Sequence, residues 1–313
     1  SFKPEQYSYY PDYPPFYEKL SQHFGIPQDR IVVGLGAEDL IRSLYMICCD
    51  PGDGVAVTWP SCAMYEVYTK ILDLQFCPLW TEPGKNLAPI DWSRLPPSLR
   101  LVFIVNPGQP VETCLMPDEI RELAVQCRDR GVVLVIDEAY FSFGAPSALR
   151  LIYEFDNLVI LRSFSKAFGL AGLRCGFAMT QPRLARALHA IRLSGEVPAY
   201  TMHIVSWFLG NYHPRVADGI EWIVRGRQLL MRRFGEVAFK DYGAYANHIL
   251  VDLESPKLCV SIVDQLAAKG IRIRQSWATR PFDQHALITC GGPDLMAKFW
   301  NELTNIQCGG SGS

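Results

Sequence analysis

The chain has 313 residues, of which 49% are hydrophobic and 20% are charged, and its formal net charge is −2. Basic residues are scattered along the chain, and no apolar run is long enough to span a bilayer. This composition excludes a strongly basic nucleic-acid-binding protein and a membrane-spanning one. We expect a soluble globular protein of one large domain or two unequal domains, with small molecules as partners and no nucleic acid or membrane.

Ten cysteines occur singly or as the pair Cys48-Cys49, mostly within apolar stretches. Because they lack the repeated close spacing of a zinc site or a small disulfide scaffold, no metal site is predicted. We expect reduced thiols in a cytoplasmic enzyme, with structural disulfides as the alternative.

The two ends of the chain carry signals of their own. Residues 309–313 read Gly-Gly-Ser-Gly-Ser, which is the composition of a linker, and we expect them to be an added tail. The chain starts at Ser1, without an initiator methionine. Such a start is compatible with one domain of a longer polypeptide, which we keep as an expectation.

Short runs rich in valine, isoleucine and leucine alternate with stretches of helical period through the first two thirds of the chain. Buried strands are predicted over residues 30–33, 54–58, 101–105, 132–136 and 158–161. Helices are predicted over residues 37–49, 63–72, 117–130 and 182–192. Buried strands that alternate with helices predict an α/β fold with a mostly parallel sheet, in which functional groups gather on loops at the carboxyl ends of strands.

Beyond about Met202 the pattern changes to a long helical stretch. Three further strands, with a helix between them, are predicted over residues 249–252, 271–273 and 287–289. This pattern predicts a smaller C-terminal α/β domain. We therefore divide the chain into a large domain with an N-terminal segment, residues 1–205, and an interdomain helix with a small domain, residues 206–308.

The string at residues 163–176, Ser-Phe-Ser-Lys-Ala-Phe-Gly-Leu-Ala-Gly-Leu-Arg-Cys-Gly, directly follows a predicted strand. In it, Lys166 comes after the hydroxyls of Ser163 and Ser165, and Arg174 lies eight residues later. Enzymes that use pyridoxal 5′-phosphate (PLP) need a lysine amine that forms a Schiff base with the cofactor, and hydroxyl and guanidinium donors for its phosphate. The alternative, a solvated lysine in a strand-to-helix loop, suits a single Ser-Lys pair better than this full string.

A second cluster, Asp137-Glu138-Ala139-Tyr140, closes the strand predicted over residues 132–136. A carboxylate at the end of a buried apolar strand is costly unless it meets a cation. A protonated PLP pyridine nitrogen is such a cation, and its pairing with Asp137 would keep the ring an electron sink. Tyr140 is placed to hydrogen-bond the 3′-oxygen of the ring. A helix N-cap or a metal ligand is the alternative for Asp137.

A glycine-rich turn, Gly34-Leu35-Gly36-Ala37-Glu38, follows one predicted strand and opens a helix. Free backbone N–H groups at Gly36, Ala37 and Glu38, together with the helix dipole, favour an anion such as the PLP phosphate. A plain capping loop is the alternative.

In this order, these segments resemble the histidinol-phosphate aminotransferase group of the class I and II aminotransferases, which are fold-type I PLP enzymes. The resemblance runs from Tyr10 to about Ile306. It implies a large PLP-binding domain whose mostly parallel sheet, of the seven-stranded type, is sandwiched by helices, plus a smaller C-terminal α/β domain. It also implies a biosynthetic homodimer in which Tyr10 reaches the phosphate in the neighbouring subunit's site.

The resemblance further implies roles for individual residues. Lys166 would carry the Schiff base and shuttle protons, Asp137 would pair with the pyridine nitrogen, and Tyr140 would bind the 3′-oxygen. The phosphate would be held by Gly36, Ala37, Glu38, Ser163, Ser165 and Arg174. Asn247 matches a recurrent substrate-side position in the small domain.

Three positions depart from the family pattern. Gln109 stands where relatives have an asparagine that binds the 3′-oxygen, and we expect its longer amide to reach the same oxygen. Cys62 replaces the aromatic residue that stacks on the cofactor ring, which removes a contact of roughly 0.5–1.5 kcal/mol. Leu287 replaces the arginine that clamps the substrate α-carboxylate, and leucine cannot bind a carboxylate.

The missing clamp leaves three explanations open. In the first, another cation, Arg272, Arg274 or Arg280, binds the carboxylate. In the second, the substrate carries its anion elsewhere, as a phosphate or phosphonate, or carries no anion at all. In the third, the carboxylate is turned out of the ring plane and lost as carbon dioxide, as in the related threonine-phosphate decarboxylase.

We predict a PLP-dependent aminotransferase that acts on a small amino acid or on a phosphorylated or phosphonate-type amine, with an oxo-acid partner. The substrate-binding candidates are Asn247, Arg274 and Arg280. A PLP-dependent decarboxylase or lyase, and a PLP-binding domain without catalysis, are the alternatives.

Overall fold

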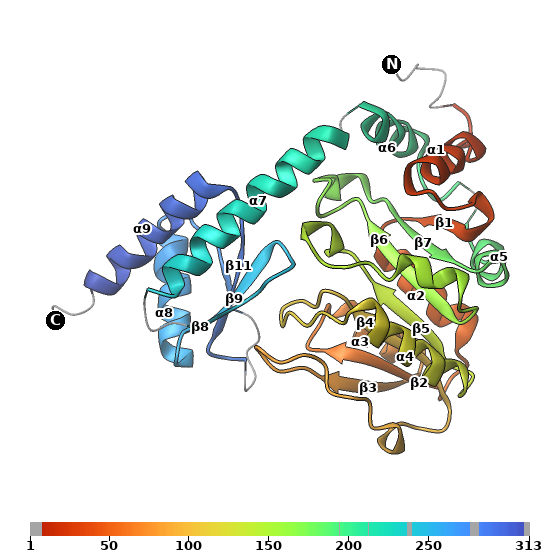
Figure 1. Ribbon diagram of the computed structural model, residues 1–313, viewed down its shortest axis with the longest axis horizontal. Helices are drawn as coiled ribbons and strands as arrows, with labels where there is room; N and C mark the ends of the chain where they lie inside the picture. Colours follow the sequence, from red (N-terminus) through yellow and green to blue (C-terminus); the bar gives the residue numbers. More distant parts are fainter. Residues whose placement is uncertain (1–7, 194, 212, 237–239, 276–281, 310–313) are drawn as a thin grey trace.

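The computed structural model of the protein describes residues 8–193, 195–211, 213–236, 240–275 and 282–309. This part of the chain contains two β-sheets, and the long helix α7 (His213–Phe234) connects the regions around them (Figure 1). None of the described helices combines the length and the apolar character needed to cross a membrane.

The large sheet has seven strands in the order β1-β7-β6-β5-β4-β2-β3. These strands are β1 (Ile31–Gly34), β2 (Gly54–Trp59), β3 (Gln75–Trp80), β4 (Leu99–Val105), β5 (Val133–Asp137), β6 (Leu158–Ser163) and β7 (Gly176–Thr180). Neighbours pair in parallel from β3 to β6, whereas β7 is antiparallel to both β6 and β1. The expected α/β fold with a mostly parallel seven-stranded sheet is therefore confirmed.

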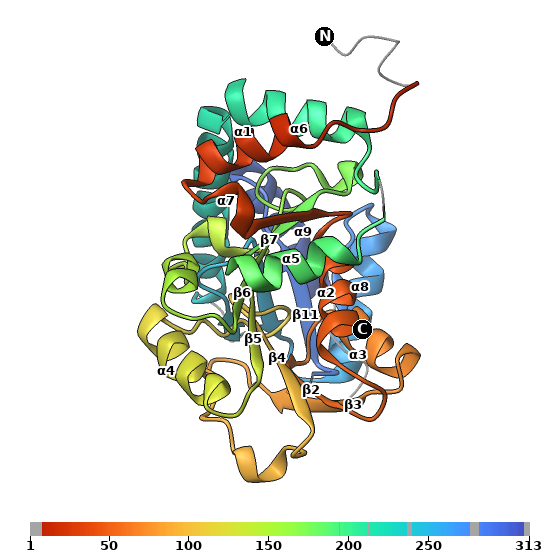
Figure 2. The ribbon, with the colours of Figure 1, turned by 90° about the vertical axis from the view of Figure 1, so that its right-hand side faces the viewer.

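Helices cover both faces of this sheet (Figure 2). One face packs against α1 (Pro14–Phe24), α4 (Pro117–Arg128) and α6 (Ala199–Asn211), and the other against α2 (Ala37–Cys48), α3 (Met64–Ile71) and α5 (Pro182–Ala190). The strands require this arrangement because both of their faces are apolar. In β5, Leu134 and Ile136 pack on the side of the first group of helices, and Val135 packs on the side of the second.

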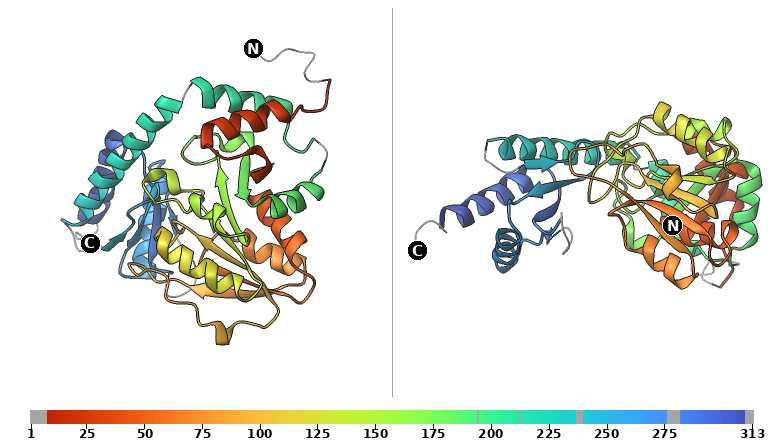
Figure 3. Two further views of the ribbon diagram at one scale, coloured as in Figure 1. Left: turned by 45° about the vertical axis from the view of Figure 1, so that its right-hand side comes forward. Right: turned by 90° about the horizontal axis from the view of Figure 1, so that it is seen from below.

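The small sheet has four strands in the antiparallel order β10-β11-β9-β8. They are β8 (Lys240–Tyr242), β9 (His248–Asp252), β10 (Arg274–Gln275) and β11 (His285–Thr289). On one face, Ile249 and Ile288 pack against α7 and against α8 (Pro256–Ala268) and α9 (Pro293–Gly309). On the other face, Leu250 contacts Val111 of the loop after β4, and Figure 3 shows the two sheets with their helices in two further orientations.

Most elements expected from the sequence lie within a few residues of the observed ones, but the strand expected over residues 271–273 is wrong. Those residues belong to no strand, and β10 begins only at Arg274. Ile271 and Ile273 pack against the apolar cluster beneath α8 and α9, so their hydrophobicity serves packing rather than strand pairing. The expected boundary after residue 205 falls within α6 and stays a prediction.

Several elements were not anticipated: α1, α9, β3, β7 and β8. β3 is an edge strand with partly exposed residues and a proline, Pro78, which hides it from a search for buried runs. β7 and β8 are short, and β7 starts at Gly176, the last residue of the string that contains Lys166.

Replacing Ile160 by alanine should lower the free energy of unfolding by about 2–5 kcal/mol, because Ile160 is fully buried in the middle of β6. The matched control is Ile71→Ala, because Ile71 is 68% exposed on α3. This substitution should change the free energy of unfolding by less than about 0.5 kcal/mol. Urea unfolding followed by circular dichroism measures both. Equal midpoints for the two variants would contradict the assigned core.

Candidate active site

The carboxyl ends of β2, β4, β5 and β6 lie at one edge of the large sheet, because these strands are parallel neighbours. At or just after these ends stand four residues that the sequence singled out, Cys62, Gln109, Asp137 and Lys166. All four line one cavity of about 260 Å³. The other predicted residues in its wall are Gly36, Ala37, Glu38, Tyr140, Ser163, Ser165 and Arg174.

Asp137 is the buried acid of this cavity. Its Oδ2 accepts a hydrogen bond from the Tyr65 hydroxyl (2.8 Å), and its Oδ1 accepts one from the Ala139 backbone N–H (2.9 Å). Burial raises the pKa of Asp137, while these two donors and the neighbouring Lys166 ammonium lower it. Burial, and then the adjacent carboxylate, raise the pKa of Tyr65 well above its usual value, so Tyr65 remains a donor. The cavity thus presents a hydrogen-bonded carboxylate in an apolar wall.

Lys166 and Tyr140 face each other in the same cavity. The Lys166 Nζ lies 5.1 Å from the centre of the Tyr140 ring. Burial raises the pKa of Tyr140, and the charge of Lys166 opposes that shift. A buried phenol beside an amine can hydrogen-bond an oxygen atom held between them.

Positive charge gathers at another side of the cavity. α2 begins at Ala37 after Gly36, and no side chain caps its first turn. Gly36 has a φ of 82°, and a Cβ in its place would lie 2.8 Å from Arg174 Nη2. The guanidinium therefore lies beside the start of the helix, and its ion pair with Glu38 is long, at 4.0 Å. A cation beside a helix N-terminus is unfavourable alone and favourable around a bound anion.

Among the cavity residues that were not anticipated from the sequence, two carry hydroxyl groups. Tyr65 holds Asp137, and the buried Ser61 hydroxyl has no hydrogen-bond partner in the described part of the chain. Both follow β2, at the same sheet edge as Cys62. For Ser61, a hydroxyl on that loop is the signal that could have found it. Tyr65 is the second residue of α3, and its role depends on the contact with Asp137.

Three predicted residues do not line this cavity. Tyr10 is 86% exposed and lies against Gly195. Asn247 lies in the turn directly before β9, and Arg274 begins β10 of the small sheet. Arg280 lies outside the described residues.

Leu287 is buried in β11, in an apolar cluster with Val111, Leu250 and Phe282. Arg274 is its cross-strand partner in the pairing of β10 with β11. Because directly paired residues of antiparallel strands share a face of the sheet, Arg274 lies one strand away from Leu287 on the same face. Arg274 is thus beside, rather than at, the position where the family resemblance implies an arginine.

His248 is fully buried at the start of β9. Its ring packs at 77° to the Tyr140 ring, with centroids 5.4 Å apart. Neither ring nitrogen has a hydrogen-bond partner among the described residues. Burial, and then the charges of Arg227 and Lys166, lower the pKa of His248 to about 3, and the Gly108 backbone opposes that shift. The ring is therefore neutral at neutral pH.

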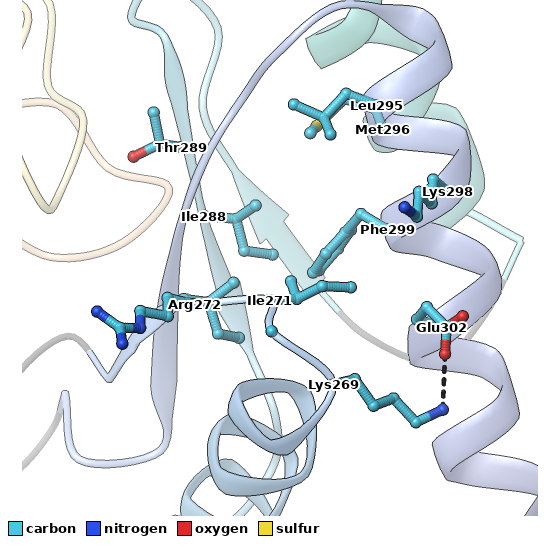
Figure 4. Close-up of a pocket in the computed structure, with 12 residues that line it drawn as sticks. Lys269, Ile271, Arg272, Ile288, Thr289, Leu295, Met296, Lys298, Phe299 and Glu302 are labelled. Atoms are coloured by element: carbon cyan, nitrogen blue, oxygen red, sulfur yellow. Dashed lines mark hydrogen bonds and ion pairs between the residues drawn. The ribbon is translucent and has the colours of Figure 1, made fainter.

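A larger cavity, of about 470 Å³, lies between α9 and the small sheet (Figure 4). Ile288 and Phe299 contribute to its apolar wall, and an ion pair of 2.6 Å joins Lys269 to Glu302. Arg272 lines this cavity, with its guanidinium directed away from the apolar side chains. Among its described lining residues there is no fully buried carboxylate and no arginine beside a helix start, so we place the candidate active site in the cavity around Lys166.

Comparison with known proteins identifies related sequences along nearly the whole chain. A sequence model of the family described as aminotransferase class I and II matches residues 4–276. The chain is 30% identical over 302 residues to the histidinol-phosphate aminotransferase of Pyrococcus furiosus, an alignment that covers 94% of this chain and 83% of that relative.

Solved structures share the fold. The histidinol-phosphate aminotransferase of Sinorhizobium meliloti, in complex with pyridoxal-5′-phosphate, matches with a TM-score of 0.82 at 20% identity, covering 96% of this chain and 83% of that one. The L-threonine-O-3-phosphate decarboxylase of Porphyromonas gingivalis matches with a TM-score of 0.80 at 19% identity, covering 97% and 92%. At these identities the likeness is one of fold alone.

The contribution of His248 to stability should become unfavourable as the pH drops from about 6.5 towards about 3, because His248 stays neutral in the folded state while the unfolded chain binds the proton. At pH 5 this effect amounts to about 2 kcal/mol. His248→Phe removes it, so the variant should lose less stability than the parent between pH 7 and pH 5. Urea unfolding at both pH values measures the difference, and identical losses would contradict the assigned protonation state.

Proposed function

The chain belongs to the aminotransferase class I and II family, and we propose that it is a PLP-dependent enzyme that transfers an amino group between a small amine and an oxo-acid. The amine is a small amino acid or a phosphorylated or phosphonate-type amine. The observation that carries this proposal is the meeting of Lys166, the buried Asp137 and the Arg174 anion cradle in one cavity.

The residues of the cavity fit PLP at both of its charged ends. The guanidinium of Arg174 beside the uncapped start of α2 suits a dianionic phosphate, and the unpartnered Ser61 hydroxyl offers a further polar contact. Asp137 makes no ion pair with a described lysine or arginine, so its carboxylate is available to a protonated ring nitrogen. When bound, PLP supplies an electron sink for negative charge on the substrate carbon.

The side chains of the cavity would then have separate roles in the reaction. Lys166 Nζ would hold the cofactor covalently and, once displaced by the incoming amine, carry the proton of the substrate carbon. Asp137 would keep the ring nitrogen protonated, because a carboxylate at hydrogen-bond distance favours the cation. The Tyr140 hydroxyl and the Gln109 amide would orient the 3′-oxygen, and Tyr65 would keep the Asp137 carboxylate in place.

On the substrate side, Arg274 is our proposed partner for a carboxylate or phosphate, supported by its cross-strand position beside Leu287. Asn247 would add a neutral donor from the turn before β9. Decarboxylation is the second candidate only through likeness of fold, so transamination is preferred. An assay that follows oxo-acid and carbon dioxide from the same amine separates the two reactions.

We further propose that the enzyme is a homodimer. The exposed ring of Tyr10, which lies outside its own chain's cavity, supports a role in the neighbouring subunit's site. A cytoplasmic location is proposed from the cysteines, nine of which are free thiols in the described part of the chain.

Lys166→Ala should abolish both the visible absorbance of the covalently held cofactor and the turnover of amine, because no other group can replace its amine. Lys70→Ala is the matched control, since Lys70 is an exposed lysine of α3 paired only with Glu66 (2.7 Å). Absorbance spectra and oxo-acid formation are measured for both variants. A Lys166→Ala protein that keeps the spectrum of its parent would refute the assignment.

Arg274→Ala should raise the KM for an anionic amine about ten- to a hundredfold, because it removes a charge-assisted hydrogen bond to the substrate. The KM for a neutral amine should change little. Lys298→Ala, which removes an exposed charge from α9, serves as the control. Steady-state kinetics with both kinds of amine decide the matter, and an equal loss for both would show that Arg274 does not recognise the anion.

A further inference from the structure

The loop between β4 and α4 joins the candidate site to the small domain. Gln109 of this loop lines the cavity around Lys166. Two residues further on, Val111 is buried against the small domain, and Glu112 reaches the turn that precedes β9. The same short segment thus has one end in the active site and the other on the opposite domain.

The carboxylate of Glu112 binds three consecutive backbone N–H groups. Its Oε1 accepts hydrogen bonds from Ala244 and Tyr245, both at 2.6 Å, and its Oε2 accepts one from Ala246 at 3.0 Å. The buried Arg227 of α7 donates to the Ala246 carbonyl from the other side. Charge-assisted bonds of this kind are stronger than neutral ones, and a row of backbone N–H groups is a natural anion seat.

Val111 makes an apolar contact directly beside this charged one. Its side chain is 2% exposed and belongs to a cluster with Leu250, Phe282 and Leu287. Leu287 stands where the family pattern has an arginine, and its side chain is therefore covered by other side chains of the protein. A side chain so covered leaves no room for a substrate carboxylate at that position.

The turn that Glu112 holds leads straight into a residue that contacts the wall of the cavity, His248. Asn247 follows Ala246, and its carbonyl accepts a hydrogen bond from the Cys290 backbone N–H (2.8 Å). The next residue, His248, packs its ring against Tyr140. A displacement of residues 244–246 would consequently move both Asn247 and the ring that supports Tyr140.

We propose that Val111 and Glu112 form an interdomain clasp, a contact that fixes residues 244–248 against the Tyr140 side of the active site before any substrate binds. Glu112 is a positioning residue in this account, acting through the backbone N–H groups it binds. The clasp itself is independent of the reaction, while its effect on substrate rests on the proposed function of Asn247. In this account the Glu112 carboxylate thus fixes the backbone of residues 244–246, which precede Asn247 on the proposed substrate side of the site.

The test compares Glu112→Ala with Glu119→Ala. Glu119 accepts a hydrogen bond from the Met116 backbone N–H (2.7 Å) at the start of α4, so it is a carboxylate bound to a backbone amide but not to the other domain. Hydrogen–deuterium exchange of peptides covering residues 240–250, without substrate, should become about tenfold faster in Glu112→Ala and stay unchanged in Glu119→Ala. Glu112→Gln, which keeps one good acceptor, should give an intermediate rate.

The kinetic arm measures amine KM with kcat and the cofactor absorbance. Glu112→Ala should raise KM about tenfold while the absorbance of bound cofactor stays that of the parent. Unchanged exchange at residues 240–250 would overturn the clasp, and faster exchange with unchanged KM would overturn its role in substrate binding. A chain that turns over no amine, yet shows exchange that depends on Glu112, would count against the proposed function and leave the clasp standing.

Discussion

The carboxylate of Asp137 at the end of β5 is the constraint around which this protein is arranged. A charge in an apolar wall is unfavourable unless donors surround it, and here Tyr65 and Ala139 supply the hydrogen bonds. Tyr65 can do so only because α3 begins directly after the loop from β2, two strands away in the sheet. The order of the parallel strands in the sheet therefore determines which functional groups lie next to each other in the site.

The cavity has a negative group on one side and a positive region on another, and this polarity is its most specific property. The carboxylate of Asp137 suits a cationic ring, while Arg174 and the start of α2 suit a phosphate. Gly176 permits this arrangement, since a Cβ there would lie 2.4 Å from the Ala37 nitrogen and push β7 away from α2. The contacts of Val111 and Glu112 then join this region to the small sheet and to the turn before β9.

Much of this site could be predicted from the sequence because its residues stand in short strings after buried strands. Lys166, Asp137 and Arg174 line one cavity, as their positions at strand ends indicated. Local patterns carry no such information about Tyr65, whose role depends on a contact with a residue 72 positions later.

The remaining differences have physical causes as well. β3 escaped prediction because an edge strand is only partly buried, and the strand expected over residues 271–273 failed because its isoleucines pack without pairing. The contact of Glu112 with the turn at residues 244–246 joins segments more than a hundred positions apart, and no periodicity encodes it.

The central claim is that Lys166 holds the cofactor in this cavity. Borohydride reduction of the PLP-loaded protein, followed by peptide mass spectrometry, tests it most directly, because reduction makes the covalent link permanent. We predict that Lys166 carries the pyridoxyl group and that no other lysine does. Modification of a different lysine, with Lys166 unmodified, would contradict it.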